Sequence, residues 1–287
     1  MKLLTKETDF IKTIKLIPQY KQYEDPVIFH CFWKGTLNKK HLISIISCYY
    51  FNILNTNNKI ILWLEKNKNT KYNKKIEKYA EIINFDYNEE FKTLKYKNEI
   101  SYGFKNRITE YADFIRLLLL YNYGGCWFDL DCFFLKSFNP IFSSYQDEIC
   151  VYQWEKRNYP NNAITISLHK YSAKLKVIID FFYYQKTGWR TSKNVTYDTD
   201  IDYLVLPCSW FDASWINNPY KLSWDDFFNK EDKIYTFNNF FKGSLCYHWH
   251  NRYDMTIKKR SIMNQLYKII LSKLSKLSKL SNLSSSI

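Results

Sequence analysis

The chain has 287 residues, of which 46% are hydrophobic and 19% aromatic, so it can bury a sizeable core and is not an intrinsically disordered chain. Six glycines and six prolines are few for this length, which disfavours an all-β fold with many tight turns. The formal net charge is +14, and residues 251–287 hold eight Lys or Arg against one acid, Asp254. The rest of the chain is also basic. Such a basic body suits nucleic acid, an anionic membrane or a phosphorylated substrate equally well.

The seven cysteines are scattered and form no CxxC pair, which predicts buried free thiols in a reducing compartment. The N-terminal residues include no apolar segment typical of a signal peptide, and no segment reads as a transmembrane helix. We therefore expect a soluble, cytoplasmic protein. Its basic tail can bring it into peripheral contact with a membrane surface.

The first ninety residues alternate between strand and helix patterns. Residues 1–25 are mixed and polar, with a short helix and a lead-in. Buried strands are expected at 26–33 and 60–64 and a third strand within 82–87, and the helices between them are expected at 39–53 and 71–83. This alternation predicts an α/β layer architecture with a mostly parallel sheet flanked by helices.

A polar stretch, 88–106, reads as a loop. It precedes the clearest helix of the chain, 107–122, which Gly124 and Gly125 end. The segment CWFDLDCFFL then resumes as a strand. The elements expected after it are strands at 149–154, 162–168, 204–208 and 244–250 and a helix at 170–185.

The tail after residue 255 contains the short-period repeat KLSKLSKLSNLSSS. A period of three drifts around an α-helix, so its leucines would form a smeared stripe. The tail reads either as an amphipathic, Lys-rich surface helix or as a disordered end, and the sequence leaves this open.

The residues that indicate chemistry lie between Tyr111 and Asp131, in YADFIRLLLLYNYGGCWFDLD. Asp113 and Arg116 are three residues apart and share a helix face. After the glycine pair, an apolar strand delivers Asp129 and Asp131, which point the same way if the strand stays regular.

Two carboxylates that emerge from an apolar strand are costly unless a cation meets them. A hard divalent ion with oxygen ligands is the natural partner, and such ions commonly complete their coordination with phosphate oxygens. A bound metal can then neutralise a departing diphosphate, as transfer from a nucleotide sugar requires. The D-x-D pattern alone is weak, but its combination with D-x-x-R, the glycine pair and an aromatic strand is far more specific.

The segment ADFIRLLLLYNYGGCWFDLD resembles the DXD sugar-binding region of the family 32-type glycosyltransferases, which include initiating α-mannosyltransferases, α-1,4-galactosyltransferases and capsule glycosyltransferases. The resemblance implies a GT-A fold with a mixed, mostly parallel sheet, a nucleotide-sugar donor, a Mn²⁺ or Mg²⁺ ion and retention of anomeric configuration. It is close over residues 111–131 and loose over residues 26–251. We expect a GT-A domain over residues 1–250 and a basic, low-complexity tail over 251–287.

Roles carry over from the resemblance residue by residue. It implies that Asp113 contacts hydroxyls of the donor sugar or ribose and that Arg116 lies near the sugar and diphosphate. It implies that Asp129 contacts both the donor and the water molecules bound to the metal, and that Asp131 binds the metal directly. These roles place Asp113, Arg116 and Asp129 among the catalytic residues.

Three further site residues lie outside this segment. IFHCFWKG (28–35) is similar to the family's opening strand, which implies that Trp33 stands by the nucleobase. YHWHN (247–251) is similar to its closing segment and makes His248 a further metal or diphosphate ligand, with Asn251 beside it. Asn161 and Asn162 begin a strand that we expect to face the site, and we expect one of them, assigned as Asn162, to touch the donor sugar.

Other polar residues receive simpler readings. His30 reads as a satisfied core histidine, and His250 as the rival of His248 on the same strand face. Trp249 can stack on a sugar or belong to the core. The run Asp198, Asp200 and Asp202 lacks the glycine of a calcium loop and reads as a solvated acidic turn. Residues 187–204 lack the Gly-Pro dipeptide that relatives often have, which puts the identity of the acceptor in doubt.

The sequence thus predicts a metal-dependent, retaining transferase of glycan biosynthesis. It would move a hexose from a UDP- or GDP-sugar to a glycan, lipid-linked or protein acceptor, and we expect no nucleic-acid partner. The rivals are a non-enzymatic binder of nucleic acid or anionic membrane and an inactive sugar-binding relative with the GT-A fold. A nucleic-acid binder would lose affinity steeply with salt and ignore Mn²⁺.

Overall fold

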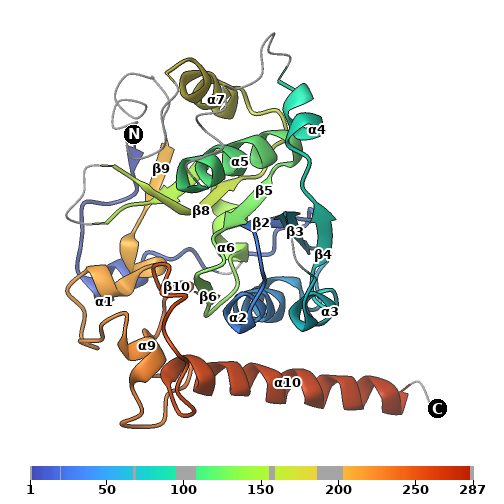
Figure 1. Cartoon of the computed structure of the whole chain (residues 1–287). Helices are drawn as coiled ribbons and strands as arrows, with labels where there is room; N and C mark the ends of the chain where they lie inside the picture. Colours follow the sequence, from blue (N-terminus) through green and yellow to red (C-terminus); the bar gives the residue numbers. More distant parts are fainter. Residues whose placement is uncertain are drawn as a thin grey trace.

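A computed structural model describes residues 2–19, 21–66, 69–94, 108–154, 159–185 and 203–284. These residues form a mixed sheet of strand order β1-β9-β7-β8-β5-β2-β3-β4 and a two-stranded sheet of β6 and β10 (Figure 1). The strands are β1 (Lys2–Leu3), β2 (Ile28–Lys34), β3 (Lys59–Glu65), β4 (Glu81–Asn84), β5 (Gly125–Phe128), β6 (Cys132–Phe134), β7 (Ile149–Tyr152), β8 (Asn161–Ser167), β9 (Tyr203–Leu206) and β10 (Cys246–His248).

Helices cover both faces of the large sheet, with α5 and α7 on one side and α2 and α3 on the other (Figure 1). The helices are α1 (Phe10–Ile14), α2 (Lys39–Cys48), η1 (Tyr49–Ile53), α3 (Lys71–Ile76), α4 (Tyr87–Lys92), α5 (Ile108–Tyr123), α6 (Asn139–Ser144), α7 (Ala173–Gln185), η3 (Cys208–Trp210), η4 (Ala213–Trp215), α9 (Asp226–Asn229) and α10 (Ile262–Ser284). The architecture confirms the predicted α/β fold with a large, mostly parallel sheet.

The central strands are apolar on both faces because each face has its own core. Phe128 of β5 packs into the core on the α2 side, and its neighbour Trp127 packs into the core that includes α5 and α7. The pairings of β2 with β3 and β5, of β3 with β4, and of β9 with β1 and β7 are parallel. Among the described strands of this sheet, only β8 runs antiparallel to its neighbours β5 and β7. Continuous apolar runs such as IILWL are what such doubly covered strands require.

The glycine pair joins α5 to β5 through two left-handed residues. Gly124 has φ +67°, and its backbone N–H donates to the carbonyl of Leu120 at 2.9 Å, which closes the helix as a C′ glycine does. Gly125 has φ +113° and starts β5 against β2. The predicted end of the long helix is confirmed, and the turn aims β5 at the site.

Several predicted boundaries were wrong. The helix expected over 39–53 is present as α2 continued by the π-helical turn η1, whereas the helix expected over 71–83 ends at Ile76, before β4. The stretch 88–106, expected as loop, includes most of the short helix α4, which Asp86 caps by accepting the backbone N–H of Asn88. Residues 95–107 lie outside the described residues. A capping aspartate signals such a short helix even without apolar periodicity.

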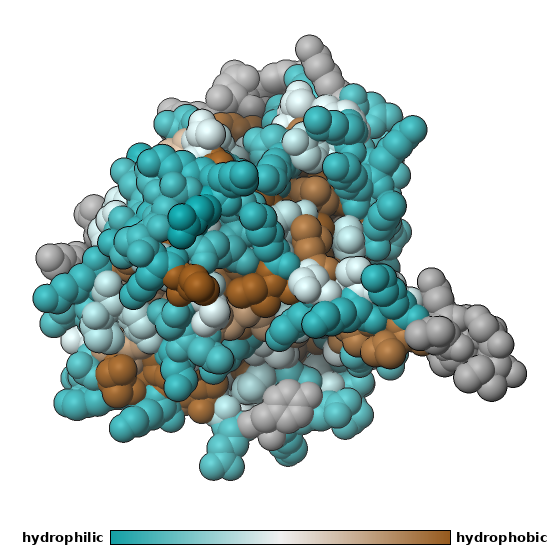
Figure 2. Space-filling model, turned by 90° about the horizontal axis from the view of Figure 1, so that it is seen from below, coloured by the Kyte–Doolittle hydropathy of each residue, from teal (hydrophilic) through white to brown (hydrophobic). Residues whose placement is uncertain are grey.

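The tail is helical over α10, which settles the alternative left open by the sequence. Its first turns are part of the core, with Ile262, Leu266 and Ile270 buried, while Leu277 and Leu280 are 43% and 63% exposed. The outer half extends beyond the body (Figure 1). On the face seen in Figure 2, apolar side chains form separate patches among hydrophilic ones.

All seven cysteines are buried with free thiols, as the sequence predicts. They lie at positions 31, 48, 126, 132, 150, 208 and 246. Within the part of the chain that the structure describes, no helix combines the length and apolarity needed to cross a membrane.

His30 is a core histidine, as expected. Its Nε2 lies 2.9 Å from the carbonyl of Gly124, and its Nδ1 accepts the indole N–H of Trp63 at 3.1 Å. This pattern requires a neutral ring with the proton on Nε2. Burial lowers the pKa of His30 to about 4, although the bond to Gly124 works in the opposite direction.

We therefore expect the free energy of unfolding to fall as the pH drops from about 6.5 toward 4. In that window the unfolded chain binds a proton at His30 and the native chain does not, so this residue contributes a slope of about 1.4 kcal/mol per pH unit. Urea unfolding at several pH values should show a shallower slope for His30→Gln than for wild type. His169→Gln, at the surface, is the control, and an equal slope in all three proteins would contradict the prediction.

Candidate active site

The two DXD carboxylates lie in the turn between β5 and β6. The backbone N–H of Asp129 donates to the carbonyl of Ala163 at 2.8 Å, and that of Cys132 donates to the carbonyl of Asp129 at 3.0 Å. The prediction of one continuous strand over CWFDLDCFFL is therefore wrong. The chain turns between Phe128 and Cys132, where the polar side chains leave the core. Asp129 consequently contacts α5, while Asp131 contacts β10 and the residues that follow it.

Arg116 connects α5 to the first of these carboxylates. Its guanidinium donates to Asp113 at 3.1 Å and to Asp129 at 2.7 Å, and it lies over the ring of Trp127. The side-chain amide of Asn162 donates to Asp113 at 2.9 Å. The structure thus brings four of the predicted residues into one hydrogen-bonded group, with Arg116 almost fully buried at its centre.

Asp131 and His248 form a buried pair. Oδ2 of Asp131 lies 3.1 Å from Nε2 of His248 and accepts the backbone N–H of Asn251 at 2.7 Å. Burial opposes ionisation of Asp131, but the charge and hydrogen bond of His248 and the N–H of Asn251 outweigh it and hold the pKa of Asp131 below its usual range. Burial likewise opposes protonation of His248, yet Asp131 raises its pKa well above the ordinary value.

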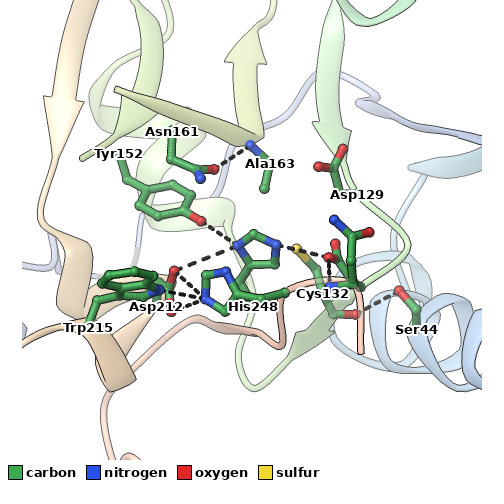
Figure 3. Close-up of polar contacts among 12 residues, drawn as sticks. Ser44, Asp129, Cys132, Tyr152, Asn161, Ala163, Asp212, Trp215 and His248 are labelled. Carbon is green, nitrogen blue, oxygen red and sulfur yellow. Dashed lines mark hydrogen bonds and ion pairs between the residues drawn. The ribbon is translucent and has the colours of Figure 1, made fainter. Parts of the chain in front are cut away.

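Two further groups hold His248 from the opposite side. Its Nδ1 lies 2.8 Å from the hydroxyl of Tyr152 and 3.7 Å from Oδ2 of Asp212. Figure 3 shows Tyr152 and Asp212 on one side of the His248 ring and Asp129 beyond the other. This arrangement leaves Nε2 directed at the acidic pair, as second partners do for metal-bound histidines.

The two carboxylates compete for ionisation. Burial raises the pKa of Asp129 to about 6 against the opposing charge of Arg116, and Asp131 adds to the rise. Oδ1 of Asp131 is buried and has no hydrogen-bond partner among the described residues. An unsatisfied carboxylate oxygen beside a second carboxylate and an imidazole is the donor chemistry that Mn²⁺ or Mg²⁺ accepts, so these residues fit a divalent cation.

All seven predicted site residues line one cavity of about 660 Å³. They are Trp33, Asp113, Arg116, Asp129, Asp131, Asn162 and His248. Trp33 lies at the end of β2, half-buried, with its ring centroid 4.1 Å from that of His41 and 5.0 Å from that of Tyr253. The roles of these residues remain predictions, but their common location is a feature of the fold.

The sequence reasoning missed Asp212, which is fully buried. Trp154 donates its indole N–H to this carboxylate at 2.7 Å, and Nε2 of His250 lies 3.0 Å from it. One ligand atom from each of Asp212, His248 and His250 could reach a common ion, since these atoms lie within 4.8 Å of one another. The signal was available: Asp212 is a lone acid in the aromatic run CSWFDASW, the same pattern that singled out Asp129.

The structure decides the interpretations of Trp249 and His250, and two other interpretations concern residues outside the described part of the chain. Trp249 is a core residue, with its ring packed against Phe228 and Tyr253. His250 lies beyond the end of β10, with φ +54°, rather than on the same strand face as His248. The acidic run at positions 198, 200 and 202, and the stretch 187–202 expected near the acceptor, lie outside the described residues.

Part of the chain matches a known family, and the fold resembles a solved structure. Residues 46–148 match the family described as a glycosyltransferase sugar-binding region containing a DXD motif. The fold is similar to that of the apo form of the glycosyltransferase GlyE of Streptococcus pneumoniae TIGR4, at 13% identity and a TM-score of 0.50, over 88% of this chain and 64% of that one.

The PaToxG glycosyltransferase is similar at 19% identity and a TM-score of 0.44, over 66% of this chain and 75% of that one. A comparison with curated proteins gives no match. The similarity to GlyE concerns the fold, and the match to the family concerns the segment that contains Asp113, Arg116 and both DXD carboxylates.

Proposed function

We propose that this chain moves a hexose from a UDP- or GDP-sugar to an acceptor hydroxyl with the aid of a divalent cation, on the premise that residues 46–148 match a glycosyltransferase sugar-binding region containing a DXD motif. One observation carries the proposal. The Asp113–Arg116–Asp129 group and the Asp131–His248 pair line the same cavity, at the end of the central strand β5.

Asp131 and His248 would hold the cation, with Asp129 beside them. When bound, Mn²⁺ or Mg²⁺ would neutralise the negative charge that develops on the departing diphosphate. Loading requires His248 to give up its proton, because a metal-bound imidazole nitrogen is unprotonated. The free carboxylate oxygen of Asp131 supports this assignment.

The other residues would orient the donor. In the reaction the bond between the anomeric carbon and the diphosphate oxygen breaks, and the diphosphate leaves with the electron pair. A bond forms from that carbon to the acceptor oxygen, and the proton of the acceptor hydroxyl passes to the departing diphosphate. Arg116, fixed by two carboxylates, opposes charge at the leaving group, while Asp113 and Asn162 position hydroxyls of the sugar.

Retention of configuration follows only from the family resemblance. No carboxylate was assigned as a double-displacement nucleophile, so we favour front-face displacement. Contact of the basic helix α10 with an anionic membrane also stays a prediction, which co-sedimentation with vesicles of anionic lipid would test.

The experiment is a thermal-shift panel of UDP- and GDP-hexoses, each with and without Mn²⁺. A ligand at about a hundred times its dissociation constant stabilises the fold by about 2.7 kcal/mol, which raises the melting temperature of a chain of this size by several degrees. We expect one donor to give this shift only with Mn²⁺, and its hydrolysis should follow. The proposal is wrong if no nucleotide sugar stabilises or is hydrolysed, and salt-sensitive RNA binding without a Mn²⁺ effect would favour the rival function.

A further inference from the structure

The cavity extends to both sides of Asp129. In the sheet β5 lies between β2 and β8, with β7 and β9 beyond β8. One arm of the cavity is lined by the end of β2, including Trp33, and by α5. The other arm is lined by residues after β7 and β9 and by the segment after β10. A transferase must bind both a donor and an acceptor beside the transferred group, and this cavity offers one arm to each.

The second arm contains a cluster of three tryptophans, Trp154, Trp215 and Trp224, which we call the indole cluster. The rings of Trp154 and Trp215 are stacked at a centroid distance of 4.7 Å and an interplanar angle of 18°, and Trp224 lies 4.9 Å from Trp215. All three side chains are partly exposed and line the cavity. Their surface is therefore partly left for a ligand and not used up by the core.

Two polar contacts hold the cluster by its edges. Trp154 donates to the buried carboxylate of Asp212 at 2.7 Å, and Trp215 donates to Nε2 of His250 at 2.8 Å. Figure 3 shows Trp215 and Asp212 together on the side of His248 away from Asp129. Rings fixed in this way form a rigid platform that loses little conformational entropy when a ligand binds.

The composition of this arm indicates the ligand. Asn161, His250 and Arg252 line it together with the indoles, so the arm offers both apolar ring faces and hydrogen-bonding groups. A sugar ring presents C–H bonds on its faces and hydroxyls around its rim, and both features are matched here. A hydrocarbon chain would offer no hydrogen bonds to these polar groups and would displace the water around them.

We propose that the indole cluster is the acceptor site and that the acceptor presents a sugar ring to it. This rests on the proposed function and deepens it, because it names the class of acceptor among those left open. The acceptor hydroxyl would then approach from the arm opposite Trp33, with Asp129 and Asp131 between the two ligands.

The test begins with the wild-type protein, Mn²⁺ and the donor found by thermal shift. Transfer is measured by mass spectrometry with methyl glycosides of glucose, galactose, mannose and N-acetylglucosamine, with a Ser/Thr peptide and with a polyprenyl phosphate. We expect a methyl glycoside to accept the sugar. Transfer only to the peptide or to the polyprenyl phosphate would overturn the inference and leave the proposed function intact.

Variants then locate the site. In Trp215→Ala we expect the KM for the glycoside to rise about tenfold or more, and the fall in transfer to exceed the fall in donor hydrolysis by a similar factor. Trp215→Phe should recover part of the loss, because it keeps a ring but not the N–H. Trp224→Ala, whose indole N–H has no hydrogen-bond partner among the described residues, provides a second test if Trp215→Ala folds poorly.

Two comparisons complete the design. In Trp33→Ala we expect the reverse result, in which the KM for the donor rises more than the KM for the glycoside. Tyr171→Ala removes an aromatic ring that is 59% exposed and outside the cavity, and it should behave as wild type. If Trp215→Ala and Trp224→Ala reduce hydrolysis and transfer in equal proportion, or reduce neither, the inference is wrong. Absence of any donor hydrolysis in wild type would instead count against the proposed function.

Discussion

Replacement of Asp131 by Asn is expected to lower Mn²⁺-dependent donor hydrolysis about a hundredfold or more. The substitution keeps the shape of the side chain and an acceptor for the backbone N–H of Asn251, but it removes the charge that faces His248. It also replaces the unpartnered carboxylate oxygen with a neutral group, which binds a hard cation weakly. The measurement is the initial rate of hydrolysis across a Mn²⁺ titration.

Asp147→Asn is the matched control. That side chain is 79% exposed and pairs with His169, itself 60% exposed, so we expect a wild-type rate and stability. Thermal unfolding of Asp131→Asn separates a folding defect from a catalytic one, because loss of a buried partner costs about 1–3 kcal/mol. A wild-type rate with an unchanged Mn²⁺ response in Asp131→Asn would refute the metal role.

Gly125→Ala is expected to destabilise the fold by about 4 kcal/mol or more, among the largest effects for a single substitution. A Cβ at this position would lie 2.2 Å from the backbone carbonyl oxygen of Ile28. The clash is with backbone of the neighbouring strand β2, so it can be relieved only by moving β5 and β2 apart. The same movement would displace the DXD turn that follows β5.

Gly35→Ala isolates that clash from backbone strain. Gly35 has φ +116°, close to the +113° of Gly125, but the nearest atom to its added Cβ is 3.9 Å away. This control should therefore cost only the strain of the positive φ, about 1–3 kcal/mol. Urea unfolding of both variants measures the difference, and equal losses would show that the contact between β5 and β2 is not the cause.

The central part of the site was predictable from sequence because its residues are close along the chain. Asp113 and Arg116 share one helix turn, and the glycine pair and apolar strand that precede Asp129 are local patterns. The bend after Phe128 was not predictable, because it depends on the pairing of Asp129 with Ala163 of β8. Local propensity does not contain that contact.

The second half of the site depends on contacts between distant segments. Trp154 and Asp212 are 58 residues apart, and Trp215 and His250 are 35 apart. Each of these residues alone reads as an ordinary aromatic or polar residue of a loop. Only the fold, by placing β7, β9 and β10 around the same end of the sheet, makes them neighbours.

Because every cysteine is buried, the reactivity of the thiols reports when the folded chain unfolds locally or globally. A thiol reagent can reach the six fully buried thiols only when the surrounding structure separates, whereas Cys208 is 7% exposed. Because the thiols are distributed from β2 to β10, the mass of the labelled protein would count how many regions open together. Modification of one or two would identify a local fluctuation, whereas modification of all at once would identify cooperative melting, without any introduced label.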